Sequence, residues 1–134
     1  MKLVDVTTQP ARNDAPLTVL EDMDGHTARL VLSGEVDLAT STILRSALYG
    51  IADANPDELI FDFSRLEFLS AAGAVAIVTE IRRRRPARTV IVSNDPSVSR
   101  SLTLLGAGAG IEIFPTLAEA RAALSSVRGA LRVC

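Results

Sequence analysis

Short apolar runs alternate with segments of helical periodicity along most of this chain, and that alternation limits the fold more than any other feature. Three brief runs, rich in β-branched or aromatic residues, predict strands: residues 58–63, 89–93 and 111–114. Four segments with apolar residues at helical spacing predict helices: residues 40–51, 71–84, 96–105 and 116–127. Such alternation is typical of a parallel sheet whose right-handed crossovers cover its faces with helices. We therefore predict one α/β domain without internal repeats.

The N-terminal part of the chain lacks this alternation and predicts antiparallel pairing instead. Two apolar runs, residues 17–20 and 27–32, are separated by acidic residues and a glycine, which is typical of a β-hairpin. The sheet is therefore predicted to be mixed, with four to five strands and about four helices. The preceding segment contains two prolines and no sustained period, so we expect an extended leader. Three of its apolar residues can add an edge strand: Leu3, Val4 and Val6.

Length and composition allow one domain with one hydrophobic core. The chain has 134 residues, and 48% hydrophobic against 22% charged residues is a globular rather than a disordered composition. We divide it into a leader (1–16), a folded domain (17–127) and a short basic tail (128–134). No run approaches the roughly 20 apolar residues that span a bilayer, and residues 1–5 lack the apolar centre of a signal peptide. We therefore expect a cytoplasmic protein that does not enter a membrane.

Residue types that carry common catalytic chemistry are scarce. Cys134 is the single cysteine and His26 the single histidine, so an internal disulfide is excluded. A metal cluster or a catalytic triad would depend on that one histidine, which lies in a predicted polar turn. Asp37 and Asp62 lie where strands are predicted to end and caps are needed, and no cluster of further polar residues accompanies them. We therefore predict a non-enzyme that holds no cofactor and no metal.

Two motifs associated with phosphates and nucleic acids have simpler structural explanations. Residues 106–110 are glycine-rich but close a predicted helix instead of opening one, so we expect Gly106 to stop the helix in the left-handed conformation. Residues 82–85 are four consecutive arginines, yet the net charge is −2 and aromatic residues make up only 4%. Cations at a helix C-terminus also complement the helix dipole. We predict no direct nucleic-acid binding, although the arginines could steer an acidic partner electrostatically.

Small residues form the turn that leads from the strand predicted at 58–63 into the next helix. They are Ser70, Ala71, Ala72 and Gly73. Side chains of this size would let the backbone of a partner approach closely. One face of the helix carries its apolar residues, and a second face is small and weakly polar: Ala72, Ala76, Thr79 and Arg83. Two explanations fit the second face, namely docking of another protein, or helix propensity and tight packing of alanine within the fold.

Four segments of the chain occur in an order and spacing that resemble a known family. They are Gly-Glu-Val-Asp at 34–37, Leu-Ile-Phe-Asp-Phe-Ser at 59–64, Phe-Leu-Ser-Ala-Ala-Gly at 68–73, and Asp-Pro-Ser-Val-Ser-Arg from 95, running to Leu-Leu-Gly at 104–106. The resemblance is to STAS domain proteins of the anti-sigma factor antagonist family, and it covers about residues 17–127. Each segment alone is a weak signal, whereas their combination implies a single STAS-like domain.

This resemblance implies a binding protein that regulates transcription. Family members bind an anti-sigma factor, often a serine kinase with a GHKL-type ATP fold, and so free a sigma factor to direct RNA polymerase. The candidate partner-binding residues are Asp37, Ser70, Ala71, Ala72, Gly73 and Ala76. Asp37 has two possible roles, in the interface and in capping of the helix that begins near Thr40.

The turn at 70–73 departs from the usual family motif at the phosphorylated position. That motif places an aspartate, a phosphorylated serine, a serine or threonine, and a glycine where this chain has Ser70, Ala71, Ala72 and Gly73. Ala71 has no hydroxyl, so the phosphoserine switch is predicted to be missing. Ser70 can replace the aspartate as helix N-cap by accepting a backbone N–H from Ala72 or Gly73. Ser70 is also the alternative acceptor, one residue early, although capping would occupy its oxygen.

The missing acceptor leaves a second function open. A sensory or scaffolding STAS protein would use the same fold to bind a small ligand or other STAS domains in a stress-signalling complex. A kinase-like anti-sigma partner would favour the antagonist, whereas a bound small molecule would favour the sensor. The sequence does not decide between a monomer and a homo-oligomer.

Overall fold

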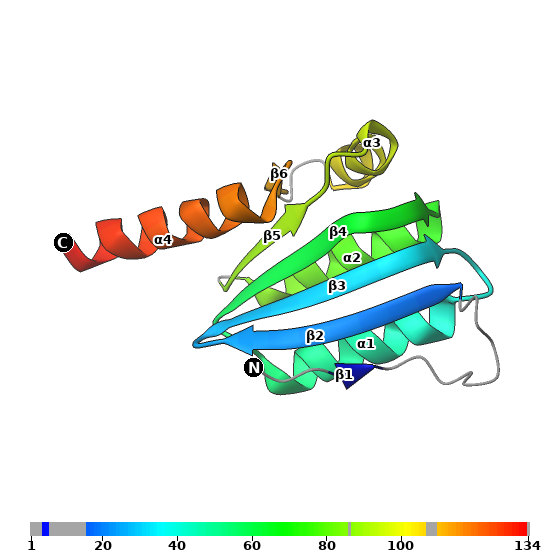
Figure 1. Ribbon diagram of the computed structural model, residues 1–134, viewed down its shortest axis with the longest axis horizontal. Coiled ribbons are helices and arrows are strands. Elements are labelled where there is room, and N and C mark those ends of the chain that lie inside the picture. Colours follow the sequence, from blue (N-terminus) through cyan, green and yellow to red (C-terminus); the bar gives the residue numbers. More distant parts are fainter. Residues whose placement is uncertain (1–3, 6–15, 86, 107–109, 134) are drawn as a thin grey trace.

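Six strands form one mixed sheet in the order β1-β2-β3-β4-β5-β6 (Figure 1). The computed structural model describes residues 4–133 except 6–15, 86 and 107–109, and it describes side chains between residues 16 and 126. The strands are β1 (Val4–Asp5), β2 (Leu17–Asp24), β3 (Thr27–Val36), β4 (Glu58–Leu69), β5 (Arg88–Val92) and β6 (Ile113–Phe114). The helices are α1 (Ser41–Ala54), α2 (Ala71–Arg84), α3 (Pro96–Leu105) and α4 (Leu117–Val133). The predicted α/β class and mixed sheet are confirmed, with two-residue strands at the edges of four longer ones.

The strands β2 and β3 form the predicted antiparallel hairpin and extend beyond the predicted residues. Their pairing leaves a two-residue turn, in which Gly25 adopts a φ of 62°, as tight hairpin turns require. The leader adds an edge strand, because β1 pairs antiparallel with β2 at Val4–Asp5. The other two residues expected in this strand, Leu3 and Val6, lie outside the described residues.

Two strand predictions are corrected in length. β4 continues beyond the predicted residues 58–63 to Leu69 and pairs in parallel with β3, although two register shifts interrupt the pairing. Such shifts disturb the regular alternation of side chains, so the second half of β4 carries no clear strand pattern in its sequence. β6 is shorter than the predicted run at 111–114, because it pairs with β5 only at Ile113 and Phe114.

The helices are divided unequally between the two faces of the sheet. β3, β4, β5 and β6 are neighbouring and parallel, so each crossover moves in the same direction across the sheet. Right-handed crossovers then place α1, α2 and α3 on one face, where they cover the larger core. On the other face, α4 packs its Ala120 and Leu124 against Ile60, Val90 and Val92. The crossovers therefore cover one face, and not both as expected.

A side chain caps the start of α3, whereas the end of the helix differs from the prediction. The Asp95 carboxylate caps the start of this helix by accepting the Ser97 N–H at 2.9 Å. Gly106 ends the helix with a φ of −98°, so the predicted left-handed stop is wrong. A Cβ atom at Gly106 would lie 2.5 Å from Ile111 Cγ1, so close packing is the physical reason for glycine there. Residues 107–109 of the glycine-rich segment lie outside the described residues.

Candidate functional site

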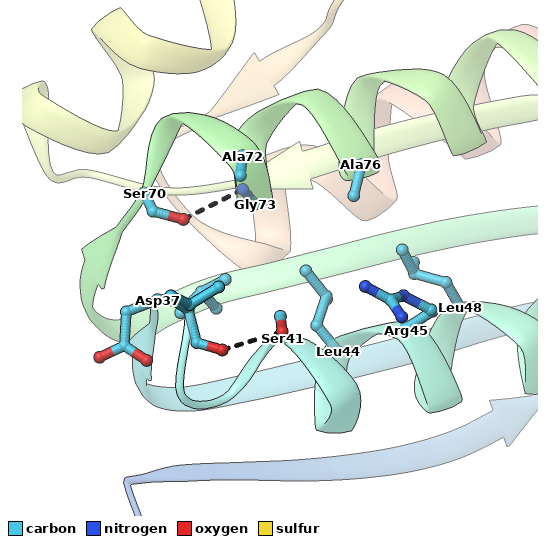
Figure 2. A pocket seen from close by; sticks show the side chains of 11 residues that line it. Asp37, Ser41, Leu44, Arg45, Leu48, Ser70, Ala72, Gly73 and Ala76 are labelled. Carbon is cyan, nitrogen blue, oxygen red and sulfur yellow. Dashed lines mark hydrogen bonds between the residues drawn. The ribbon is translucent and has the colours of Figure 1, made fainter.

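Most of the predicted partner-binding residues gather around one groove at the carboxyl ends of β3 and β4. These parallel strands end side by side, with Val36 opposite Leu69, and α1 and α2 begin directly beyond them. The N-terminal turns of the two helices enclose a groove of about 230 Å³ (Figure 2). Its lining residues are Val36, Asp37, Leu38, Ser41, Leu44, Arg45, Leu48, Ser70, Ala72, Gly73 and Ala76.

Ala71 is the one candidate residue that does not line the groove. It is exposed at the first position of α2, beside Ser70 and Ala72, which are both in the groove wall. A side chain at Ala71 would therefore be exposed at the start of α2, one residue from the groove wall, without filling the groove. Ala72 therefore lines the groove, whereas the neighbouring Ala71 does not.

The Ser70 side chain caps α2, as the sequence predicts. Its Oγ accepts the Gly73 N–H at 3.1 Å, and the Ser70 backbone is extended, with φ −69° and ψ 159°. The Ser70 N–H donates to the Val36 carbonyl at 2.8 Å, which fixes the turn against the end of β3. Because the N-cap bond uses a side-chain oxygen to satisfy a free helix N–H, Ser70 substitutes for a capping aspartate.

Gly73 is required by the close approach of α2 to β3. A Cβ atom at this position would lie 2.5 Å from Val36 Cγ1 and 3.1 Å from Leu69 Cδ1. Both neighbours are buried at the carboxyl ends of their strands, and the valine side chain is short and stiff. The absence of a side chain at Gly73 therefore sets how closely the first turn of α2 packs on the sheet edge.

Asp37 shapes the loop that leads from β3 into α1. Its Oδ1 accepts the Thr40 N–H at 3.0 Å, and the Thr40 Oγ1 in turn accepts the Asp37 N–H at 2.9 Å. These hydrogen bonds close a turn before α1, but Thr40 is itself the N-cap residue, so the Asp37 carboxylate caps no N–H of the helix and the predicted capping role is not observed. Thr40 is the N-cap residue of α1, but its hydroxyl makes no hydrogen bond to the helix N–H groups. The buried hydroxyl instead lies 2.9 Å from the Glu35 carbonyl oxygen, to which it donates.

Sequence reasoning missed the α1 side of the groove. The helical spacing of Leu44 and Leu48 predicts core residues, and no motif in the sequence marks Arg45 as part of a binding site. Ser41, Leu44, Arg45 and Leu48 share one helical face, and this spacing would have identified the face if the neighbour of α1 had been known. Leu38, in the loop ahead of α1, is 90% exposed although it lines the groove.

Other apolar side chains are exposed at the same end of the molecule. Phe68, at the end of β4, and Val75, in the second turn of α2, are each 50% exposed. Leu38 lines the groove, whereas Phe68 and Val75 do not. Exposed apolar residues near a groove are typical of a site that another molecule covers.

Two polar residues considered for chemistry have structural roles elsewhere. Asp62 is buried in β4, where its carboxylate accepts hydrogen bonds from Arg29 Nη1 at 3.2 Å and from Ser64 Oγ at 2.6 Å. His26 is exposed in the hairpin turn, and its Nδ1 lies 3.3 Å from an Asp57 carboxylate oxygen. Within the described residues, no three metal-ligating side chains gather as a metal site would require.

The arginine run at 82–85 does not form a uniform basic surface. Arg83 pairs with Glu80 one turn earlier. Arg84 is buried and donates from Nε to Thr89 Oγ1 at 2.9 Å and from Nη2 to the Pro56 carbonyl at 2.8 Å. Burial lowers the pKa of the Arg84 guanidinium, while the nearby Glu80 carboxylate opposes this effect. Part of the run therefore ties α2 to neighbouring elements and is not free for a partner.

Comparison with known proteins agrees with this fold. Residues 20–120 match the STAS domain family, and the chain belongs to that family. It is 30% identical over 118 residues to the anti-sigma-F factor antagonist RsfB of Mycobacterium tuberculosis, across 86% of this chain and 94% of the relative. Within the described residues, no helix has the length and apolar character needed to cross a membrane.

Solved structures of similar proteins include two anti-sigma factor antagonists. One is from Mycobacterium paratuberculosis, with a TM-score of 0.73 and 26% identity over 84% of this chain and 94% of that protein. The other is SpoIIAA in its unphosphorylated form, with a TM-score of 0.61 and 26% identity over 83% of this chain and 96% of that protein. The fold is therefore shared with proteins of this class along nearly their whole length.

Proposed function

We propose that this protein is an anti-sigma factor antagonist that binds an anti-sigma factor through the groove between α1 and α2. The observation that carries the proposal is the groove itself, which brings together Asp37, Ser70, Ala72, Gly73 and Ala76. Relatives of this chain are named as antagonists of this kind. The protein would act in the cytoplasm by sequestering the anti-sigma factor, for which a GHKL-type serine kinase is the expected class, and it would catalyse no reaction of its own.

The physical character of the groove suits a protein partner. Its walls are mostly apolar, and small residues on α2 leave the helix backbone accessible. Leu38 lines the groove, is 90% exposed and would lose contact with water in a complex. Burial of apolar surface contributes roughly 25 cal/mol per Å², so contacts of this kind supply much of the stability of a protein interface.

We also propose that phosphorylation at the α2 N-terminus does not release the partner. Ala71 offers no hydroxyl, and the Ser70 oxygen is engaged by the Gly73 N–H. Incubation with the anti-sigma kinase and ATP should leave residues 70–73 unmodified in peptide mass spectra, and the complex should persist. Phosphate on Ser70 together with dissociation of the complex would contradict this proposal.

A pull-down with a matched pair of charge variants tests the proposed interface. Ala71→Glu places a carboxylate one residue from the groove wall, in the first turn of α2. The helix dipole stabilises negative charge at this end of a helix, so the variant is expected to fold. Ala118→Glu places the same charge in the first turn of α4, on the other face of the sheet. We expect the wild type and Ala118→Glu to retain an anti-sigma factor from native cells and Ala71→Glu to lose it. Equal recovery by all three proteins would contradict the proposed site.

A further inference from the structure

Arg45 is a free cation in the wall of the groove. It projects from α1 beside Leu48, opposite Ala76 on α2 (Figure 2). Its guanidinium makes no hydrogen bond or ion pair with any described residue, and it is exposed. Four other arginines have carboxylate partners within the protein: Arg29, Arg83, Arg88 and Arg121. The charge of Arg45 is thus available to a molecule that enters the groove.

No acidic residue near Arg45 on the two groove helices is placed to neutralise it. The positions three and four residues away along α1 hold Ser41, Thr42, Leu48 and Tyr49, none of which is acidic. On α2, Glu80 is already paired with Arg83. The one acidic residue that lines the groove is Asp37, which lies at its opposite end in the loop before α1.

We infer that the anti-sigma factor segment that occupies this groove is apolar along one face and carries a carboxylate opposite Arg45. An apolar occupant removes water from the groove wall, and a guanidinium that loses water without gaining an acceptor is strongly unfavourable. A carboxylate restores the lost hydrogen bonds and can accept two from the guanidinium fork. This inference rests on the proposed function and specifies the chemistry of the partner at the same site.

The spacing along α1 limits the form of that segment. Ser41 and Leu48 mark the two ends of the groove face of α1, about 10 Å apart at the rise of an α-helix. Two turns of a partner helix would cover this length. Such a helix would place its carboxylate over Arg45 and an apolar side chain three or four residues away, about one turn along α1 near Ser41 and toward Asp37.

Affinity measurements with variants of Arg45 test the inference. Purified anti-sigma factor would be titrated against the wild type, Arg45→Gln, Arg45→Glu and the control Arg100→Glu, which changes an exposed arginine of α3 outside the groove. We expect Kd to rise at least tenfold for Arg45→Gln and further for Arg45→Glu, with Arg100→Glu within threefold of the wild type. Unchanged urea unfolding of each variant would attribute the loss to the interface.

A charge exchange then identifies the partner carboxylate. Each exposed Asp and Glu of the anti-sigma factor would be changed to Arg, and one such change should restore binding to Arg45→Glu. Binding of Arg45→Glu within twofold of the wild type, with Ala71→Glu still inactive, would overturn the inference and leave the proposed function intact. A loss that no single exchange restores would also overturn it. If no anti-sigma factor binds the wild type, the proposed function and the inference both fail.

Discussion

Single residues at the start of α2 determine how the groove is built. Ser70 satisfies a free N–H of the helix, and Gly73 permits the helix to approach β3. Both residues have a structural effect that is separable from any effect on a partner. Their contributions can therefore be measured as changes in the free energy of unfolding of the protein alone.

Loss of the Ser70 cap should destabilise the protein by a modest amount. We expect Ser70→Ala to lower the free energy of unfolding by about 1 kcal/mol, because the Gly73 N–H then lacks its acceptor. The matched control is Ser46→Ala, an exposed position within α1, where alanine should be neutral or slightly stabilising. Urea denaturation followed by circular dichroism measures both changes. Equal stability of Ser70→Ala and the wild type would contradict the capping role.

The same substitution should have opposite effects at two helical glycines. Gly50, in α1, has no atom within 4 Å of an added Cβ, so Gly50→Ala should stabilise the protein by roughly 0.5–1 kcal/mol. Gly73→Ala would place its methyl group 2.5 Å from Val36 Cγ1, and we expect a net loss of about 1–3 kcal/mol. Thermal unfolding of the two variants shows directly whether each substitution raises or lowers stability. A stabilised Gly73→Ala would show that the approach of α2 to β3 is looser than described.

The residues that the sequence could predict are those whose role is local. The Ser70 cap and the Asp37 turn each depend on four consecutive positions, so both can be predicted from neighbouring residues in the sequence. Arg45 and Leu38 were missed because their importance depends on α2 lying beside α1, which no local pattern specifies. The Thr40 hydroxyl does not cap α1, because the loop directs it back to the Glu35 carbonyl.

At the scale of elements, periodicity predicts the presence of all four helices but gives the ends of strands poorly, and α4 continues to Val133 through most of the predicted tail. The helix at 71–84 occurs with the predicted limits, because its apolar spacing and the proline that follows mark both ends. β4 is longer than predicted, since its second half is specified by pairing with β3 and not by its own alternation. The sequence also could not predict that α4 packs on the second face of the sheet, because the apolar stripe of this helix would suit either face.

Packing of α4 on the second face should contribute strongly to stability. Leu124 is 1% exposed and contacts the smaller core of the protein, so Leu124→Ala should lower the free energy of unfolding by about 2–5 kcal/mol. Leu104→Ala is the control, since that leucine of α3 is 71% exposed and its loss should cost less than about 0.5 kcal/mol. Chemical denaturation measures the change in the free energy of unfolding for both variants. Similar small losses would mean that α4 is only loosely attached.

At the scale of the whole molecule, the topology determines where the groove lies. Successive parallel strands place the starts of α1 and α2 at the same edge of the sheet and on the same face. The STAS family resemblance anticipated this arrangement, whereas strand and helix alternation alone gave the α/β class but not the order of strands. The exposed Leu38 side chain and the free Arg45 guanidinium are then features of one groove, which we propose binds an anti-sigma factor.

Release of a sigma factor from its anti-sigma factor is the most direct test of that account. A preformed complex of the two proteins, with a fluorescent label on the sigma factor, would be titrated with the wild type, Ala71→Glu and Ala118→Glu while anisotropy is recorded. We predict release of the sigma factor by the wild type and by Ala118→Glu, and at least tenfold weaker release by Ala71→Glu. Absence of release by the wild type, or equal release by Ala71→Glu, would contradict the central claim that the groove is the antagonist site.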